Sequence, residues 1–341
     1  MGYKMIPSTW YFLAAANQLK RGQIKRVQID GSYFALYRSA SGQAYAVQDR
    51  CLHRHVPLSS GQVQGERIAC PYHGWQYAGD GRIALVPALG ADASPPQCQL
   101  KHLEVIESQG FIWGKTKGDG QTPPPIFAHY LEKGWSSFVM YSEFEAGVEA
   151  CLENFLDCPH ATFVHRYWFR APTAQAVQAQ LAYLDDGAQV RYFEEPREKS
   201  VVWRLLAPAK GKMQHTDRFI APATSRVDYE FPSGLAYVIT SHCTPIAPNR
   251  TQVVTVISFK SRWGGLVKLF FKPLSQKILR QDIDMLALQA KNRQDQGFPA
   301  AVSTPADLLG PAIWGWRAAI KQHVPYHAPE QTQERHVTIY L

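Results

Sequence analysis

Two stretches decide the fold of the N-terminal part of the chain: CLHRHVPLSSG (51–61) and CPYHGWQY (70–77). In each, a cysteine is followed two or three residues later by a histidine, in a loop that contains proline and glycine; the first stretch has a second histidine, His55. The four candidate ligands are Cys51, His53, Cys70 and His73. Two thiolates and two imidazoles suit either a tetrahedral zinc ion or a [2Fe–2S] cluster in which His replaces Cys on one iron.

The way in which the two loops share the ligands favours the cluster. Zinc fingers and ribbons usually keep like ligands together, with paired cysteines in one place and paired histidines in another. Here each loop supplies one of each, as is needed if one iron takes both cysteines and the other takes both histidines. Structural zinc is the alternative, and a zinc protein would be colourless and would contain no acid-labile sulfide.

The Cys-x-His-x16-Cys-x2-His pattern, with Pro71, Gly74 and Trp75 around its second half, resembles the Rieske iron–sulfur motif. The resemblance implies a [2Fe–2S] cluster on the four ligands. Neutral His ligands raise the reduction potential of such a cluster to roughly −150 to +300 mV, against about −400 mV for plant-type clusters. The cluster relays single electrons and breaks no bonds itself. His55 fits neither ligand pair and is interpreted as a loop residue.

The length and composition of the chain indicate a globular protein of about two domains. The chain has 341 residues, of which 45% are hydrophobic and 19% are charged, and length alone predicts about two domains. The net charge of +8 is dispersed and no nucleic-acid motif accompanies it, so we expect no nucleic-acid partner. The apolar run Trp10–Ala16 is too short for a signal peptide or a membrane span. Sparse cysteines outside the cluster motif predict reduced thiols and a cytoplasmic location.

The N-terminal domain is expected to be all-β and to cover residues 8–118. Its segments RVQID, SYFALYRSA and QAYAVQD alternate apolar and polar residues and are separated or followed by Gly-containing turn signals. FIWGK closes the domain, and the polar, proline-rich stretch KTKGDGQTPPPIF (115–127) is typical of a linker.

The remainder, 119–341, is expected to be an α+β domain. Six predicted strands begin near residues 136, 188, 199, 226, 235 and 251. Predicted helices follow at 266–296 and 305–323, with one further helix from residue 147. This order predicts an antiparallel sheet wrapped around a helix-covered cavity, a helix-grip (START-like) arrangement suited to a small apolar ligand. The basic, apolar stretch 262–280 is interpreted as an amphipathic helix packed on the core, and we expect no membrane contact.

The segment ENFLDCPHATFVHRYWF (153–169) carries a second candidate metal site. Asp157 and His160 would share one face of a helix with Glu153, but His165 would lie about 140° away. Pro159 disfavours helix just before it, so we expect the helix to break here and let both imidazoles converge. Two imidazoles and one carboxylate form the facial triad of non-haem Fe(II) oxygenases, and Asp157 is the nearest candidate carboxylate.

A downstream helix offers another carboxylate. In LRQDIDMLALQ (279–289) the apolar stripe of the predicted helix places Asp282 about 60° from its centre and Asp284 about 140° away. A ligand must face the interior, so Asp282 is the better candidate. A solvated helix charge is the alternative interpretation of the same residue.

Taken together, the motifs resemble those of the Rieske non-haem iron oxygenases over essentially the full chain. The resemblance implies that His160, His165 and Asp282 bind Fe(2+). It implies that Asp157 bridges the two metal sites of neighbouring subunits, in contact with His73 of one subunit and His160 of the other, within a head-to-tail homotrimer. Asn154 matches a family position close to the iron, and Glu153 is interpreted as structural. The chain departs from many relatives at Gln281 and Ala287, where acidic residues are common, which leaves the surroundings of the iron site open.

The resemblance implies an oxygenase component that inserts oxygen from O2 into a small aromatic or cyclic substrate. The chain has no Gly-rich dinucleotide motif, so NAD(P)H electrons would arrive through a separate reductase or ferredoxin. Its size resembles the vanillate- and dicamba-type monooxygenase branch, which implies hydroxylation or oxidative O-dealkylation. Aromatic-ring cis-dihydroxylation is the enzymatic alternative, and a Rieske electron carrier with a ligand-binding domain is the alternative from another class.

Overall fold

The computed structural model describes residues 9–341 except for several short segments. The segments left out are 91, 117–121, 167, 169–174, 194–212, 261–265, 298–300, 323, 325 and 328–333. The chain divides into two compact units, Met1–Pro125 and Ile126–Leu341. The predicted domain boundary after residue 118 lies outside the described residues, as does the predicted strand that begins at residue 199.

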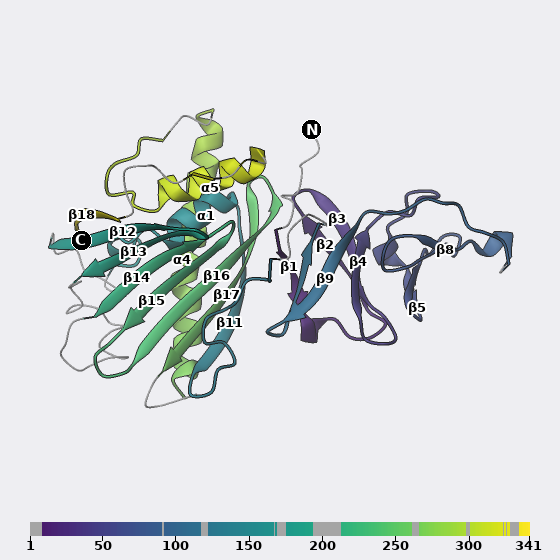
Figure 1. Cartoon of the computed structure of the whole chain (residues 1–341), viewed down its shortest axis with the longest axis horizontal. Coiled ribbons are helices and arrows are strands. Elements are labelled where there is room, and N and C mark those ends of the chain that lie inside the picture. The colour runs from purple at the N-terminus through teal and green to yellow at the C-terminus, as the bar shows by residue number, and fades with distance from the viewer. Residues whose placement is uncertain are drawn as a thin grey trace. The chain divides into compact units, whose positions relative to one another are not determined.

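Unit 1 is built from two antiparallel sheets (Figure 1). The larger has six strands in the order β1-β10-β9-β4-β3-β2. Its strands are β1 (Tyr11–Ala15), β2 (Ile24–Ile29), β3 (Ser32–Arg38), β4 (Ala44–Gln48), β9 (His102–Ser108) and β10 (Phe111–Lys115). Alternating side chains of this sheet form one apolar core, with Phe34, Leu36 and Ile112 fully buried.

The smaller sheet of unit 1 carries the two cysteine–histidine loops. Its strands are β5 (Gln62–Gln64), β6 (Arg67–Ala69), β7 (Gln76–Tyr77) and β8 (Ile83–Leu85). The first loop leads from β4 to the 3-10 helix η2 (Leu58–Ser60), and the second joins β6 to β7. A separate apolar cluster that includes Leu58, Ile68 and Tyr77 packs beneath both loops.

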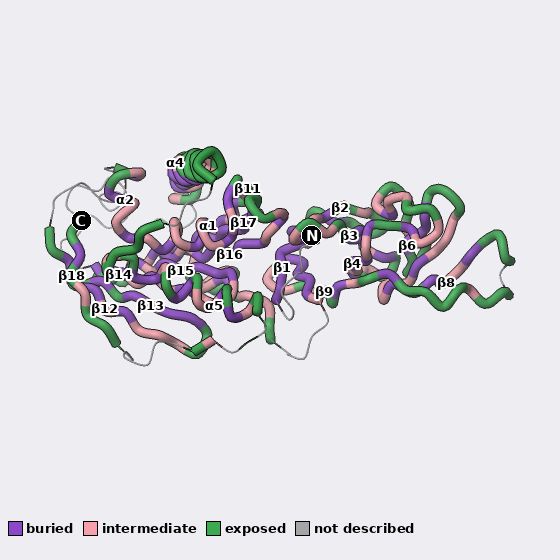
Figure 2. Tube along the Cα trace, turned by 90° about the horizontal axis from the view of Figure 1, so that it is seen from above, coloured by how far each residue is buried: buried purple, intermediate pink, exposed green. Residues whose placement is uncertain are grey.

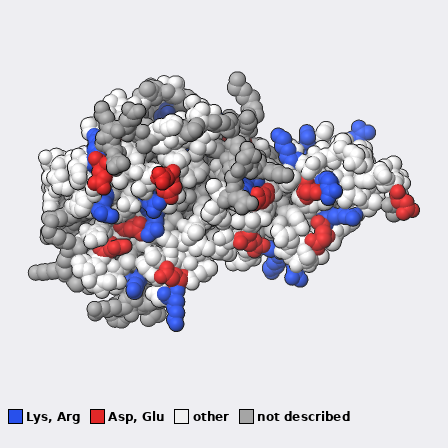
Figure 3. All heavy atoms as spheres, viewed as in Figure 1, with Lys and Arg blue, Asp and Glu red and all other residues white. Residues whose placement is uncertain are grey.

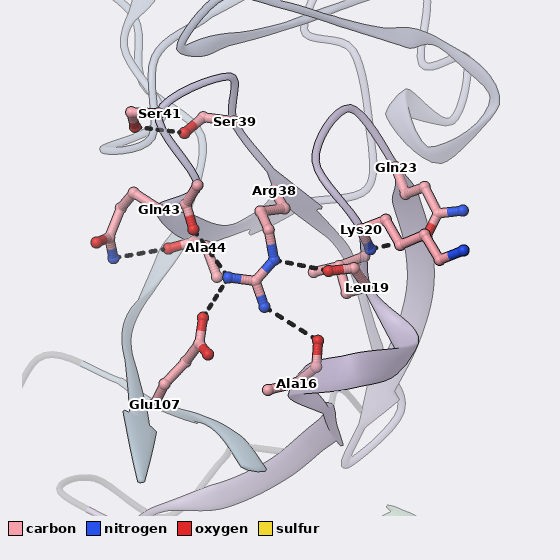
Figure 4. A network of polar contacts seen from close by, with 11 residues as sticks. Ala16, Leu19, Lys20, Gln23, Arg38, Ser39, Ser41, Gln43, Ala44 and Glu107 are labelled. Atoms are coloured by element: carbon pink, nitrogen blue, oxygen red, sulfur yellow. Dashed lines mark hydrogen bonds and ion pairs between the residues drawn. The ribbon is translucent and has the colours of Figure 1, made fainter. Parts of the chain in front are cut away.

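Arg38 joins several backbone segments of the larger sheet (Figure 4). Its guanidinium donates to the carbonyl oxygens of Leu19 at 2.6 Å and Ala16 at 3.2 Å, and it also pairs with the Glu107 carboxylate. Each of these contacts satisfies a carbonyl or a charge that would otherwise be partly desolvated. Arg38 therefore fixes the end of β3 against the segment that follows β1.

Unit 2 contains an eight-stranded antiparallel sheet in the order β11-β17-β16-β15-β14-β13-β12-β18 (Figure 1). Its strands are β11 (Ser136–Phe144), β12 (Ala176–Leu184), β13 (Gly187–Phe193), β14 (Gln214–Ile220), β15 (Thr224–Glu230), β16 (Ala236–Ala247), β17 (Arg250–Lys260) and β18 (Glu334–Tyr340). Three of these strands, β12, β14 and β18, were not expected from the sequence. In β14 and β18, polar and charged residues hide the alternation of buried positions. Strand β12 contains no Thr, His or charged residue, but its three Ala residues weaken the strand signal.

The helices of unit 2 pack against this sheet. They are α1 (Val148–Phe155), α2 (His160–Phe163), α4 (Leu266–Asp295) and α5 (Gly310–Gln322). Figure 2 shows α4 along one face of the sheet, with its exposed side turned away from the strands. Leu286 of α4, Ile313 of α5 and Leu152 of α1 join the sheet residues in one core. The predicted α+β class, with an all-β first domain and an antiparallel sheet held by helices in the second, is confirmed.

The surface and the helices show two further properties of the chain. Figure 3 shows basic and acidic side chains interspersed on the face it draws, so the positive net charge forms no single patch among the coloured atoms there. None of the helices in the described residues combines the length and the apolar character that a membrane span requires.

Candidate metal sites

The two cysteine–histidine loops of unit 1 fold in the same way. In the first, the Cys51 N–H donates to Val56 O at 2.9 Å and the His55 N–H donates to Cys51 O at 2.9 Å. In the second, the Cys70 N–H donates to Trp75 O and the Gly74 N–H donates to Cys70 O, with the same residue offsets. The two loops are therefore structural repeats, each of which presents its cysteine from the same point of the turn.

The repeat explains His55, which fits neither ligand pair. His55 has φ +61°, and Gly74 at the equivalent point of the other loop has φ +69°. This left-handed region is available to glycine and, less readily, to histidine. His55 is thus the residue that closes the first turn, and its side chain is exposed.

The side chains of the four predicted ligands converge between the loops. Cys51 and Cys70 are buried, and the imidazole centroids of His53 and His73 lie 4.6 Å apart. The ring of His53 stacks on Trp75 with an interplanar angle of 4°, which fixes its orientation. Burial lowers the pKa of His53, and the nearby His73 and Arg54 add to the effect.

These donors fit a Rieske-type cluster. His53 Nδ1 is buried without a hydrogen-bond partner, an arrangement that is costly unless the nitrogen binds a metal. Cys51 Sγ lies 3.2 Å from the Tyr77 hydroxyl, which also accepts the Leu52 N–H at 2.9 Å. Such a hydrogen bond to a ligand sulfur would help to tune the reduction potential. The donor set is thus two buried thiols facing two imidazoles.

The second candidate site lies in unit 2, at the helix break that the sequence predicts near Pro159. Helix α1 ends at Phe155, and α2 begins at His160 directly after Pro159. The break turns His160 and His165 toward each other, so that their ring centroids lie 5.1 Å apart.

Helix α4 supplies the third member of this site. His160, His165 and Asp282 place ligand atoms within 4.8 Å of one another. Asp282 Oδ1 lies 3.0 Å from His165 Nε2 and 3.5 Å from His160 Nε2. Asp282 is 7% exposed, whereas Asp284, two residues on, is exposed and pairs with Arg280.

The close approach of the three side chains suits a shared cation. Asp282 Oδ1 is buried and lacks a hydrogen-bond partner among the described residues, although two imidazole nitrogens lie within 3.5 Å of it. A buried carboxylate oxygen of this kind is costly unless it binds a metal ion. Burial raises the pKa of Asp282, but the two imidazoles outweigh it, so that the pKa is lowered. Burial likewise lowers the pKa of His160, and Asp282 outweighs it to give a raised pKa.

Each imidazole of the cluster is held through its other nitrogen. His160 Nδ1 contacts the backbone oxygen of Asp157, and His165 Nδ1 lies 3.0 Å from Gln281 Oε1. Both partners can act as acceptors, so each Nδ1 carries the proton and each Nε2 presents its lone pair. This is the usual way in which proteins orient metal-binding histidines, and the donor set fits a non-haem Fe(II) ion.

The three residues line a cavity between the sheet and α4. The described residues around it enclose about 120 Å³, comparable with the ~150 Å³ that accommodates a benzene ring in a protein core. Apolar side chains such as Phe155, Ile239 and Leu279 supply much of the wall. The cavity is therefore suited to an apolar group about the size of one ring.

Asp157, Asn154 and Glu153 lie around a second cavity that shares His160 with the first. Asp157 lines both cavities. Asn154 Oδ1 is buried without a hydrogen-bond partner among the described residues. Burial raises the pKa of Glu153 to about 7. A hydrogen bond from Trp314 acts in the opposite direction, and nearby carboxylates raise the pKa further by smaller amounts.

Sequence reasoning missed one polar pair in the first cavity. His215 and Asp217 of β14 both line it, and His215 Nε2 lies 2.9 Å from Asp217 Oδ1. The available signal was the spacing of His215, Asp217 and Phe219, which alternate with exposed or half-buried residues and therefore share one face of a strand.

Comparison with known proteins places both units in one class, the Rieske-type oxygenases. Residues 9–106 match the Rieske [2Fe-2S] domain, and residues 144–322 match the vanillate O-demethylase oxygenase C-terminal domain. The chain belongs to the Rieske oxygenase family that carries this vanillate O-demethylase type of C-terminal domain. The Rieske match supports a [2Fe–2S] cluster in unit 1.

Individual relatives include proteins with several different names. Cholesterol 7-desaturase nvd of Hemicentrotus pulcherrimus is 28% identical over 290 residues, which covers 75% of this chain and 58% of that protein. The 4beta-methylsterol monooxygenase of Methylococcus capsulatus is 34% identical over 191 residues, with 54% and 50% covered. Protein TIC 55 of Arabidopsis thaliana is 31% identical over 349 residues, with 95% and 61% covered. The chain thus spans between half and about three fifths of these relatives.

Solved structures share the fold. Dicamba monooxygenase bound to dicamba superposes with a TM-score of 0.75 at 18% identity and covers 94% of this chain and 98% of that one. Pseudomonas putida CBB5 NdmA with caffeine gives a TM-score of 0.74 at 21% identity, with 92% and 90% covered. At these identities the likeness establishes the fold of the chain.

Proposed function

We propose that this chain is the oxygenase component of a Rieske non-haem iron system that monooxygenates a small aromatic or cyclic substrate. The observation that carries the proposal is the position of His160, His165 and Asp282 on the wall of a largely apolar cavity. An electron carrier, even one with a ligand-binding domain, needs no such triad beside its cavity. The family match supports an oxidoreductase of this general kind.

Each residue at the candidate iron site would have a distinct role. His160 Nε2, His165 Nε2 and a carboxylate oxygen of Asp282 would hold one Fe(2+), which leaves the remaining positions toward the cavity. When bound, the cluster supplies single electrons and the iron supplies activation of O2. Gln281 and the Asp157 carbonyl would keep both imidazoles in the tautomer that offers Nε2. The apolar wall excludes water and presents a substrate C–H bond.

We further propose that Asp157 connects the two metal sites of neighbouring subunits in a homotrimer. His73 is exposed at the tip of its loop, where a second chain can reach it. Asp157 is half-buried beside His160. A carboxylate between two imidazoles, each on a different metal, offers a hydrogen-bonded route for electrons and couples it to protonation.

Hydroxylation or oxidative O-dealkylation is the proposed reaction type. The match to a vanillate O-demethylase oxygenase domain over residues 144–322 supports it, and so do the names of monooxygenase relatives. Electrons from NAD(P)H would enter through a separate reductase or ferredoxin. A cytoplasmic location is part of the proposal because the described cysteines are all free thiols.

A single experiment tests the reaction type. The purified protein is reduced anaerobically, mixed with O2 and screened for O2 consumption against methoxylated aromatics, alicyclic rings and polycyclic natural products. We expect a product mass that shows one added oxygen or the loss of a methyl group. Addition of two oxygens would identify cis-dihydroxylation instead, and no substrate-dependent O2 uptake with any class would support the electron carrier.

A further inference from the structure

The sheet face that lines the first cavity is arranged in three cross-strand rows. One row is aromatic and runs Tyr192, His215, Tyr229, Tyr237 and Phe259 across β13 to β17. The next row is mainly aliphatic and runs Val190, Asp217, Val227, Ile239 and Ile257 across the same strands. The third contains hydroxyl groups at Ser225, Ser241 and Thr255. His215 and Asp217 are therefore the exceptions in two otherwise apolar or phenolic rows.

The geometry of this pair is fixed by its neighbours. His215 lies between the rings of Tyr192 and Tyr229, with centroids at 4.6 and 4.4 Å and interplanar angles of 19° and 15°. The stacking keeps the imidazole from turning, so Nε2–H donates to Asp217 Oδ1 at 2.9 Å. Both side chains are at most 3% exposed. The pair is thus a built, rigid polar feature of the cavity wall.

A buried pair of this kind contributes little to the stability of the fold. Taking an imidazole and a carboxylate out of water is costly, and exchange of a buried polar pair for apolar residues of similar size is often neutral or stabilising. Phe and Val would continue the two rows without a break. A pair retained against this background has a use in the cavity that it lines.

We propose that His215 and Asp217 form a substrate anchor that hydrogen-bonds an uncharged hydroxyl group on an otherwise apolar, ring-sized part of the substrate. A hydroxyl can donate to a carboxylate oxygen of Asp217, and His215, whose Nε2–H already donates to Asp217, holds that carboxylate in place. The Asp217 carboxylate repels anions, and a cation would lose its hydration among apolar walls. The cavity also contains His160, His165 and Asp282, so the anchor would orient the substrate toward the iron; this last step rests on the proposed function.

The test compares two ring-sized probes that differ in one group. Phenol and toluene are bound to the reduced holoenzyme under anaerobic conditions, and their dissociation constants are measured by equilibrium dialysis. The quantity of interest is the preference for phenol over toluene, compared between wild type and the double variant His215→Phe/Asp217→Val. We expect the preference to fall about tenfold in the variant, the value of roughly one hydrogen bond. We also expect the melting temperature to be no lower.

Further variants keep the test decisive. Asp217→Asn preserves the shape of the side chain and should lose part of the preference, and it decides the question if the double variant does not fold. His242→Phe is the matched control. His242 is a buried histidine of β16 that is hydrogen-bonded to Thr224, and it lies on the face of the sheet opposite the cavity. Its preference should equal that of wild type. An unchanged preference in both Asp217 variants, or tighter binding of benzylammonium than of phenol, overturns the proposal.

Binding and turnover separate this proposal from the proposed function. If the preference for phenol changes tenfold but no O2 is taken up, the anchor proposal is supported and the oxygenase proposal is refuted. If O2 uptake depends on substrate but the preference does not change, the oxygenase proposal is supported and the anchor proposal is refuted.

Discussion

Gln281 shows how one side chain fixes the chemistry of the candidate iron site. Its amide oxygen lies 3.0 Å from His165 Nδ1. A neutral acceptor orients the ring without adding a second negative charge beside Asp282. The sequence alone left the surroundings of this site open, because contacts between residues 116 positions apart depend on the tertiary fold.

Gln281→Leu should weaken iron binding while the fold is kept. Removal of the acceptor leaves the His165 ring free to turn and to change tautomer, which typically costs ten- to a hundredfold in metal affinity. Chelator competition measures the affinity directly. Gln276→Leu, an exposed position of the same helix, is the control and should leave it unchanged. Equal affinities for the two variants would remove Gln281 from the site.

Asp157→Asn should retain cluster and iron but slow product formation. The amide keeps the size of the side chain but removes the charge that would link His73 of one subunit to His160 of the next. Single-turnover experiments that follow cluster oxidation and product together measure the effect. If the variant formed product at the wild-type rate and yield, Asp157 would have no bridging role.

At the scale of the element, helix α1 carries a pH-sensitive carboxyl. Burial raises the pKa of Glu153 to about 7, above its ordinary 4.5. A raised pKa in the folded state means that folding favours the protonated form, so the stabilising effect is full below about pH 4.5 and is lost as the pH rises to about 7.

Glu153→Gln should remove this loss of stability with rising pH. Between pH 5 and pH 8 the wild type should lose on the order of 1–2 kcal/mol of unfolding free energy relative to the variant, after allowance for solvent screening of a half-buried group. Denaturant unfolding at both values measures the difference. Glu145→Gln, at an exposed position, should follow the wild type. Parallel curves for wild type and Glu153→Gln would show that Glu153 ionises normally.

The turn that joins η2 to β5 depends on a close backbone contact. A Cβ at Gly61 would lie 2.0 Å from Ala69 O, directly before the candidate ligand Cys70. Gly61→Ala should therefore destabilise unit 1 by about 1–3 kcal/mol and loosen the second loop. The loss of visible cluster absorbance on heating should move to lower temperature, whereas Ser60→Ala, at an exposed neighbour, should not move it. Identical transitions would show that the contact can relax.

The elements also show which parts of the fold a sequence can predict. The helix of Asp282 was predictable because apolar residues recur at helical spacing from Leu279 to Ala290, and this stripe separates buried Asp282 from exposed Asp284. Strand β14 was not predicted, because its inward positions begin with a histidine and an aspartate and only their spacing signals a strand. Polar residues at inward positions make a strand resemble a solvated segment.

At the scale of the whole molecule, the sequence predicted the two-part organisation and the kind of each part. The cluster loops could be recognised because their ligands are close in sequence, with short and specific spacing. The cavity could not be outlined, since its walls come from strands and helices distributed from Met140 to Asp282. How many chains assemble is likewise a property that no single chain displays.

The measurement that tests the account most directly is the metal content of the purified protein. The account predicts about three irons and two acid-labile sulfides per chain, two irons in the cluster and one on the triad. Asp282→Ala should lower the iron to about two with the sulfide unchanged, and Asp284→Ala, its exposed neighbour, should keep about three. The account would be contradicted if the wild type contained only two irons per chain, or if wild type and Asp282→Ala contained the same amount of iron.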